Sequence, residues 1–208
     1  MKFTIITVTY NAGDKLAETV TDCLKQTYTD YEILVKDGMS TDGSVEKLPA
    51  DTRIRVERCK DSSIYDAMNQ AVKMAQGDYV IFMNCGDFFH TEDVLLQVAK
   101  AIDKEPGRGI YYGDAYFCKA EQIMHMPPEI TDYVCFSHIP CHQACVYAAR
   151  LCKEKLGWSK TTTYTVIKRL SERGVLKTEN TIVTALVSRE QVQEQEAQCL
   201  ASNPTHFW

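Results

Sequence analysis

The chain has 208 residues, 45% of them hydrophobic, and its formal net charge at pH 7 is −5. This length allows one good-sized domain and a small appendage, and the acidic balance argues against nonspecific nucleic-acid binding by the whole chain. No stretch approaches the roughly 20 apolar residues of a membrane span, and the apolar run after Lys2 is too short for a secretion signal. With nine cysteines and no such signal, the chain predicts reduced thiols and a cytoplasmic location.

The first segments predict a strand, a helix and a second strand with short connections. Residues 4–11 form a β-branched run, Asp14 is a plausible N-cap for a helix through about Gln26, and residues 33–36 form a strand that ends on Asp37. Two parallel strands joined by a helix place their carboxyl ends at one sheet edge. We therefore expect Thr9, Asn11 and Asp37 to lie together at that edge, where ligands bind.

Residues 61–87 predict an amphipathic helix followed by a short buried strand. The apolar run 79–83 is too short for a free-standing helix and suits a strand buried on both faces. The strand stops at Asn84, Cys85, Gly86 and Asp87, which combine a hard oxygen ligand with a glycine that lets backbone approach a ligand. An ordinary turn with a solvated aspartate is the alternative for these four residues alone.

Residues 1 to about 150 resemble family 2 glycosyltransferases of the GT-A, nucleotide-diphospho-sugar type. Six ordered blocks carry the resemblance: TIITVTYNAG at 4–13, EILVKDGMSTDGS at 32–44, DSSIYDAMNQAV at 61–72, GDYVIFMNCGDFF at 77–89, YYGDAYF at 111–117 and HQACVY at 142–147. The resemblance implies a donor site made of Thr9, Asn11, Asp37, Asp61 and Asp87. It further implies that Asp37 accepts from a uracil ring, that Asp61 lies near the base and ribose, and that Asp87 binds Mn²⁺ or Mg²⁺ bridging the donor diphosphate.

Two departures from the family pattern affect the predicted chemistry. Inverting members carry a carboxylate base after the His-Gln block, and that segment is missing here, since Glu154 is the only acid between Gln143 and Trp158. The catalytic base is therefore unknown. The family's aspartate-rich metal block appears as Asn84, Cys85, Gly86 and Asp87, with one carboxylate, a version that related branches making surface polysaccharides also have.

Residues 156–196 resemble winged helix-turn-helix regulators of the penicillinase-repressor family. Residues 159–173 predict a recognition helix, and 175–177 and 182–187 predict the two wing strands with a turn around Glu179 and Asn180. The first helix of the motif is absent. The predicted DNA contacts are Ser159, Lys160, Thr161, Thr162, Tyr164, Lys168 and Arg169, and we expect weak binding that depends mainly on phosphates.

These observations predict an α/β chain with a truncated GT-A-like sheet over residues 1–150 and a partial winged-helix segment with an unassigned tail over 151–208. The favoured function is inverting transfer of a sugar from a nucleoside-diphosphate donor, with a UDP-sugar expected, to a glycan acceptor in polysaccharide biosynthesis. Two alternatives stay open. One is a DNA-binding transcriptional regulator of the penicillinase-repressor type, and the other is a hybrid of the two with neither activity.

Overall fold

The computed structural model describes residues 1–118, 120–126, 141–155, 176–179 and 182–185. The chain divides into two compact units, and each is described by itself. The first unit comprises residues 1–126 and 141–158, and the second comprises residues 127–140 and 159–208.

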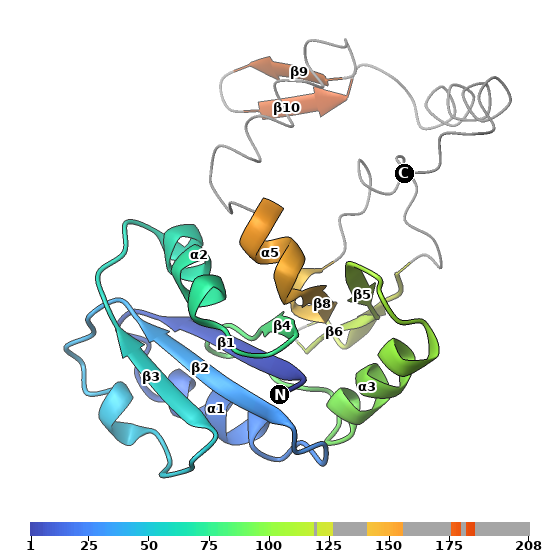
Figure 1. The fold of residues 1–208 in the computed structure, drawn as a ribbon. Helices are drawn as coiled ribbons and strands as arrows, with labels where there is room; N and C mark the ends of the chain where they lie inside the picture. Colours follow the sequence, from blue (N-terminus) through green and yellow to red (C-terminus); the bar gives the residue numbers. More distant parts are fainter. Residues whose placement is uncertain (119, 127–140, 156–175, 180–181, 186–208) are drawn as a thin grey trace, which may run out of the picture. The chain divides into compact units, whose positions relative to one another are not determined.

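The first unit is built on a six-stranded sheet with the order β3-β2-β1-β4-β8-β5 (Figure 1). Four neighbouring strands run parallel, and β8 and β5 are each antiparallel to the strand before them in that order. The strands are β1 (Phe3–Thr9), β2 (Tyr31–Asp37), β3 (Ile54–Arg58), β4 (Tyr79–Phe82), β5 (Ile110–Tyr112) and β8 (Cys145–Ala148). The predicted α/β class with a parallel-rich sheet is confirmed.

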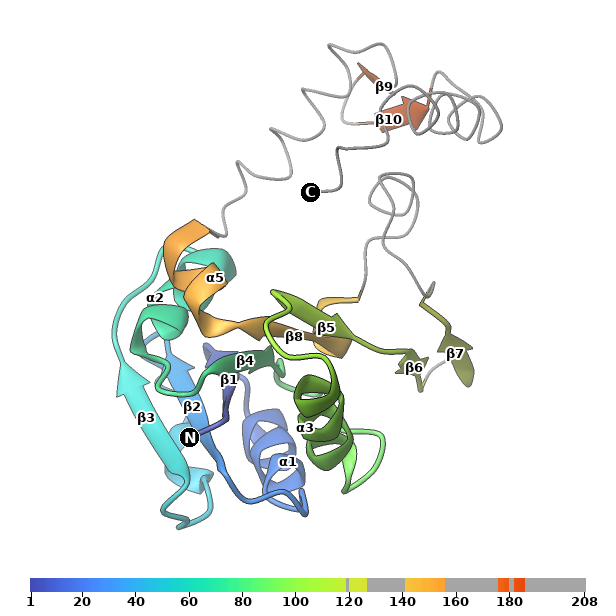
Figure 2. The ribbon, with the colours of Figure 1, turned by 45° about the vertical axis from the view of Figure 1, so that its right-hand side comes forward.

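Helices cover both faces of this sheet (Figure 2). One face packs against α1 (Asp14–Cys23) and α3 (Val94–Lys104), and the other packs against α2 (Ile64–Met74) and α5 (Ala149–Lys155). In β1, Ile5 belongs to the core on the first face and Ile6 to the core on the second. This alternation follows from the two-residue repeat of a strand and explains why a doubly covered strand is apolar along its length.

Helix α1 corrects one prediction, because Asp14 is its first residue and not its N-cap. Gly13 occupies the cap position at φ 60°, no side chain caps the helix, and the Asp14 carboxylate pairs with Lys47 Nζ at 2.6 Å. The helix also ends at Cys23, three residues before the predicted Gln26. Gln26 is buried, and its side chain donates to Thr91 O and accepts from Leu95 N, so a tertiary contact ends the helix early.

Helix α2 begins with a reciprocal cap. Ser63 Oγ accepts from Asp66 N at 3.2 Å, and the Asp66 carboxylate accepts from Ser62 N at 2.8 Å. Such a cap satisfies amide groups that the first helical turn leaves unpaired. The loop that precedes α2 is therefore fixed where it enters the helix.

Smaller elements complete the described structure. Two 3₁₀ turns, η1 (Val45–Lys47) and η2 (His142–Ala144), lie in the first unit with the antiparallel pair β6 (Ala115–Phe117) and β7 (Gln122–Met124). In the second unit, β9 (Leu176–Glu179) and β10 (Ile182–Ala185) pair antiparallel and overlap the two predicted strands, but Glu179, predicted in the turn between them, is the last residue of β9. The predicted recognition helix 159–173 and all seven predicted DNA contacts lie outside the described residues. Among the helices that are described, none has the length and apolarity needed to cross a bilayer.

Candidate donor site at the carboxyl edge of the sheet

The strand order reverses beside β1, and the polar loops gather at that point. The chain passes from β1 through α1 to β2 on one side, while β4 pairs with β1 on the other side. Thr9 and Asp37 are register partners at the last residue of β1 and of β2. In open α/β sheets, ligands bind at the carboxyl ends of the strands where the order reverses.

The loops after β1 and β2 are joined by three hydrogen bonds. Asn11 N donates to Ser40 Oγ at 2.8 Å, Thr41 N donates to Asn11 Oδ1 at 2.9 Å, and Gly13 N donates to Asp42 Oδ2 at 2.8 Å. Asn11 adopts φ 51°, a left-handed conformation that asparagine tolerates better than most residues. The structure therefore brings Asn11 to the same edge as Thr9 and Asp37, as predicted.

Asp37 is directed into the protein. Its side chain is 0% exposed, and its carboxylate accepts from Ser40 N, from Ser40 Oγ at 2.5 Å and from Arg58 Nε at 2.9 Å. Arg58 also donates to Ser40 O at 2.7 Å. These contacts make Asp37 the centre of the loop that follows β2.

Asp61 reaches the same edge from the loop before α2. Its carboxylate is paired with the ammonium group of Lys36, a fully buried residue of β2. The site is also close to Gly38, because a Cβ atom built there would lie 2.9 Å from Asp61 Oδ2 and 3.5 Å from Thr9 O. Three loops thus converge on Gly38.

Asp87 lies in a tight turn after β4. Asp87 N donates to Asn84 O at 2.9 Å, and Asn84 N donates to Asp87 Oδ2 at 3.1 Å. The Asn84 side-chain nitrogen lies 3.0 Å from Nε2 of His142, which belongs to η2. Burial lowers the pKa of His142, while the charge of Asp87 acts in the opposite direction, so a neutral imidazole is favoured in this turn.

The Asp87 carboxylate suits a hard divalent ion whose other ligands are phosphate oxygens and waters. Among the residues that the structure describes, no three His, Cys, Asp or Glu side chains gather closely enough to hold a metal by themselves. Mg²⁺ is commonly bound by one or two carboxylates together with substrate phosphates and waters. One carboxylate at the switch point therefore fits such an ion, with the Asn84–His142 contact fixing the turn.

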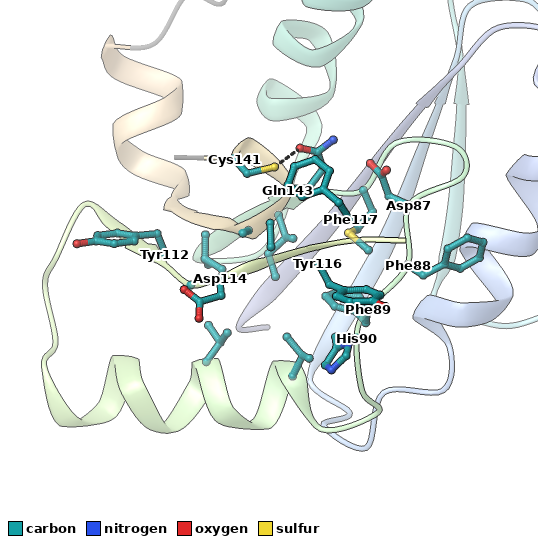
Figure 3. A pocket seen from close by; sticks show the side chains of 18 of the residues that line it. Asp87, Phe88, Phe89, His90, Tyr112, Asp114, Tyr116, Phe117, Cys141 and Gln143 are labelled. Atoms are coloured by element: carbon teal, nitrogen blue, oxygen red, sulfur yellow. Dashed lines mark hydrogen bonds between the residues drawn. The ribbon is translucent and has the colours of Figure 1, made fainter. Parts of the chain in front are cut away.

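A cavity of about 750 Å³ opens beside Asp87 (Figure 3). Its walls are largely apolar and aromatic, and the labelled side chains of Phe89, Tyr116 and Phe117 gather on one side of it. This volume lies within the range of small-molecule sites. Asp87 therefore borders both the reversed strand edge and a space large enough for a ligand.

Asp114 is a second carboxylate on the wall of this cavity. It accepts from Met126 N and contacts His125 Nδ1, both at 2.8 Å, and these bonds lower the pKa of Asp114. The side chains of His125 and Asp114 are 76% and 47% exposed. These bonds favour the ionised form of Asp114, and the lowered pKa makes it a weaker base than a free carboxylate.

Three residues of the edge had not been singled out from the sequence. Lys36, Ser40 and Arg58 hold the carboxylates of Asp61 and Asp37. Lys36 gives one signal in the sequence, since a lysine within a run otherwise suited to a buried strand requires a partner. Arg58 gives none, because its pairing depends on where β3 lies.

The sequence of this chain matches two family models. Residues 4–140 match the family model "Glycosyl transferase family 2", and residues 137–206 match the model "Penicillinase repressor". A PGL/p-HBAD biosynthesis glycosyltransferase of Mycobacterium bovis is 29% identical over 150 residues, covering 70% of this chain and 58% of the relative. A poly(ribitol-phosphate) beta-glucosyltransferase of Bacillus spizizenii is 32% identical over 103 residues, covering 46% of this chain and 16% of the relative.

Solved structures share the fold. TarS 1–349 of S. aureus, in complex with UDP-GlcNAc, superposes with a TM-score of 0.59 at 22% identity and covers 74% of this chain and 47% of its own. The mannosyltransferase PcManGT of Pyrobaculum calidifontis, in complex with GDP-Man and Mn²⁺, gives 0.56 at 16% identity, covering 96% of this chain and 61% of its own. The present chain spans 58% of the length of the mycobacterial relatives it matches.

Proposed function

The chain belongs to glycosyl transferase family 2, and from that premise we propose that it transfers a sugar from a nucleoside-diphosphate donor to a glycan acceptor by a single inverting displacement. The observation that carries this proposal is the meeting of Thr9, Asn11, Asp37, Asp61 and Asp87 at one reversed strand edge. We assign Asp61 to the nucleoside and Asp87 to the diphosphate. Thr9, Asn11 and Asp37 shape the loops that receive the nucleoside.

In this reaction an acceptor hydroxyl attacks the anomeric carbon of the donor. The new carbon–oxygen bond forms as the bond to the diphosphate breaks, the nucleoside diphosphate leaves, and the hydroxyl proton passes to a base. Asp87 would hold a divalent ion, Mn²⁺ or Mg²⁺, and when bound the ion would stabilise the negative charge of the leaving group. Asn84 and His142 keep the Asp87 turn in place for this role.

The cavity beside Asp87 is the proposed acceptor site. Asp87, to which we assign the donor diphosphate, lines this cavity. Its aromatic walls exclude water, and its few polar groups orient a bound acceptor. Besides Asp87, Asp114 is the carboxylate that lines this cavity, so it is the candidate base if transfer proceeds at ordinary family rates.

Calorimetric titration of UDP with and without Mn²⁺ tests the donor site. We expect UDP to bind more tightly with Mn²⁺. An Asp87→Asn variant is expected to lose this gain in affinity while keeping the affinity measured without metal. Equal affinity in both conditions would remove Asp87 from the metal role. Failure of the wild-type chain to bind UDP at millimolar concentration would remove the donor site.

A second candidate function is DNA binding by the second unit. It is supported by the family match over residues 137–206 and by the antiparallel pair β9–β10 at the positions expected for a wing. Binding by Lys160, Lys168 and Arg169 stays a prediction, as does the cytoplasmic location.

A further inference from the structure

The cavity beside Asp87 borders the apolar core of the first unit. Ile81 of β4, Met83 directly after that strand and Val146 of β8 line it, and all three are buried members of one core cluster. Val98 of α3 packs against the same cluster and also lines the cavity. All described residues that line the cavity belong to the first unit. The floor of the cavity is therefore the apolar layer between the sheet and α3.

Aromatic side chains add a wall to this floor. Phe89, Tyr116 and Phe117 gather on one side of the cavity (Figure 3). Tyr116 and Phe117 are each 45% exposed, and the Tyr116 ring lies 5.6 Å from the ring of His90. Exposed aromatic groups around a concave apolar space mark ligand-binding sites. Almost half of the surface of these two β6 side chains is thus available to a ligand.

The polar side chains of the walls already have partners in the protein. Gln143 Oε1 accepts from Cys141 Sγ at 2.8 Å, and the Tyr111 hydroxyl donates to Glu105 O at 2.6 Å. The Asp114 carboxylate has the two contacts described above. A sugar ring carries a hydroxyl on most of its carbons, and burying a hydroxyl without a partner costs free energy. The interior of the cavity therefore suits an apolar group better than a saccharide.

The cavity is polar at one end and apolar at the other. In Figure 3, Asp87 and Gln143 lie toward one end, and helix α3 with its small apolar side chains lies toward the other. Asp87 is also the residue that we assign to the donor diphosphate. An acceptor with its reactive hydroxyl at the Asp87 end would therefore direct the rest of its structure toward α3.

Resting on the function proposed above, we propose that the acceptor is a glycoside whose apolar aglycone, the non-sugar group at its reducing end, occupies this cavity. The aglycone lies between Val98 and Phe117, while the sugar stays at the Asp87 end. An apolar cavity of about 150 Å³ is enough to hold benzene, so a cavity of about 750 Å³ accepts a group of one aromatic ring or larger. The aglycone takes no part in bond formation and supplies affinity by its burial.

The test compares phenyl and methyl glycosides of the same sugar in the full chain with UDP and Mn²⁺ present. Pairs built on glucose, galactose, mannose and N-acetylglucosamine are titrated by calorimetry. In at least one pair we expect the phenyl glycoside to bind about tenfold or more tightly, the effect of burying an aromatic ring. Phe117→Ser, which removes part of the wall, and Val98→Phe, which fills the floor, are each expected to reduce this ratio to about threefold or less. UDP affinity should stay unchanged in both variants.

Ile123→Ser is the matched control for Phe117→Ser. Ile123 belongs to β7 of the same antiparallel pair and is 47% exposed, but it lies outside the set of described residues that line the cavity. It is expected to keep the wild-type ratio of phenyl to methyl affinity. Thermal melts report the folding of each variant, and the wild-type ratio with Phe117→Ser decides the question if Val98→Phe does not fold.

Two results would overturn this inference and leave the donor site intact. One is UDP binding in wild type without a preference for the phenyl glycoside in any pair, including the case in which no glycoside binds at millimolar concentration. The other is an equal loss of the preference in Phe117→Ser and Ile123→Ser. Absence of UDP binding in wild type would overturn the proposed function and this inference together.

Discussion

Asn84 and His142 lie 58 residues apart in the sequence, yet Asn84 Nδ2 is 3.0 Å from His142 Nε2. The contact joins the turn that holds Asp87 to η2, which directly precedes β8. A residue that stands behind a metal-binding carboxylate fixes its orientation without touching the ligand. The His-Gln block of the sequence therefore acts on the Asp87 turn through Asn84.

Replacing His142 by alanine is expected to weaken the Mn²⁺-dependent part of UDP binding by about 10–100-fold, the usual cost of losing such a support. Metal-free UDP binding should change little, because Asp61 and the loops around Gly38 stay in place. His90→Ala is the control, since His90 also lines the cavity but contacts Tyr116 instead. Calorimetry with and without Mn²⁺ measures the UDP affinity of each variant. An equal loss of Mn²⁺-dependent affinity in the two variants would contradict the role of His142.

Gly77→Ala is expected to destabilise the first unit by about 1–3 kcal/mol or more, the usual range for overpacking. A Cβ at position 77 would lie 2.6 Å from backbone atoms of both Phe3 and Thr4, and backbone cannot move aside as a side-chain end can. Gly113→Ala is the control, because nothing lies within 4 Å of its Cβ position. Urea unfolding measures the difference, and similar midpoints for the two variants would refute the expectation.

Asp51 contributes to the free energy of unfolding, and this contribution depends on pH. Hydrogen bonds from the Arg53 side chain, then from its backbone, lower the pKa of Asp51 to about 2. Since this folded-state pKa lies below the usual value, the contribution is present above pH 4 and is lost as the pH falls toward 2. Asp51→Asn should therefore lower the melting temperature at pH 7, and the gap to wild type should narrow between pH 4 and 2.

A matched control for Asp51 is Asp14→Asn. Asp14 also pairs with a basic residue, Lys47, but their side chains are 76% and 52% exposed. Exposed pairs of this kind contribute at most about 1 kcal/mol. A pH-independent gap for Asp51→Asn, or an equal gap for Asp14→Asn, would contradict the assignment.

Turnover should be slow relative to donor binding, because the family's base segment is missing after Gln143. General base catalysis supplies about 10²–10⁴ in rate, so a loss of that order is expected beside TarS 1–349 assayed with its own substrates. Single-turnover assays with a panel of UDP-sugars and glycan acceptors measure it. Transfer at ordinary family rates would contradict the expectation, and its loss in Asp114→Asn would identify Asp114 as the base.

DNA binding should be weak, insensitive to sequence and steeply dependent on salt. Phosphate contacts alone carry no sequence information, and their affinity falls as salt rises. Fluorescence anisotropy with a palindromic repressor operator and with scrambled DNA, at two salt concentrations, measures both properties. A preference for the operator of about a thousandfold or more would instead show a working regulator domain.

The sequence by itself determined the elements and their order. Apolar runs such as 79–82 form strands because they are buried on both faces, and the polar residues that stop them lie at carboxyl ends by the geometry of parallel connections. The co-location of Thr9, Asn11 and Asp37 followed from that rule, and so did the wing strands β9 and β10 from their local pattern. These are properties of short segments and simple topology.

Tertiary structure alone decided which carboxylate is buried and which is partly exposed at the strand edge. Asp37 and Asp61 are identical in chemistry, but Arg58 and Ser40 turn one inward while Lys36 and the space at Gly38 leave the other open. The early end of α1 has the same origin, since buried Gln26 bonds to Leu95 of a distant helix. Apart from Ser40, which lies 3 residues from Asp37, the partners that set these outcomes are separated by 21 to 69 residues, and no local periodicity encodes which of them meet.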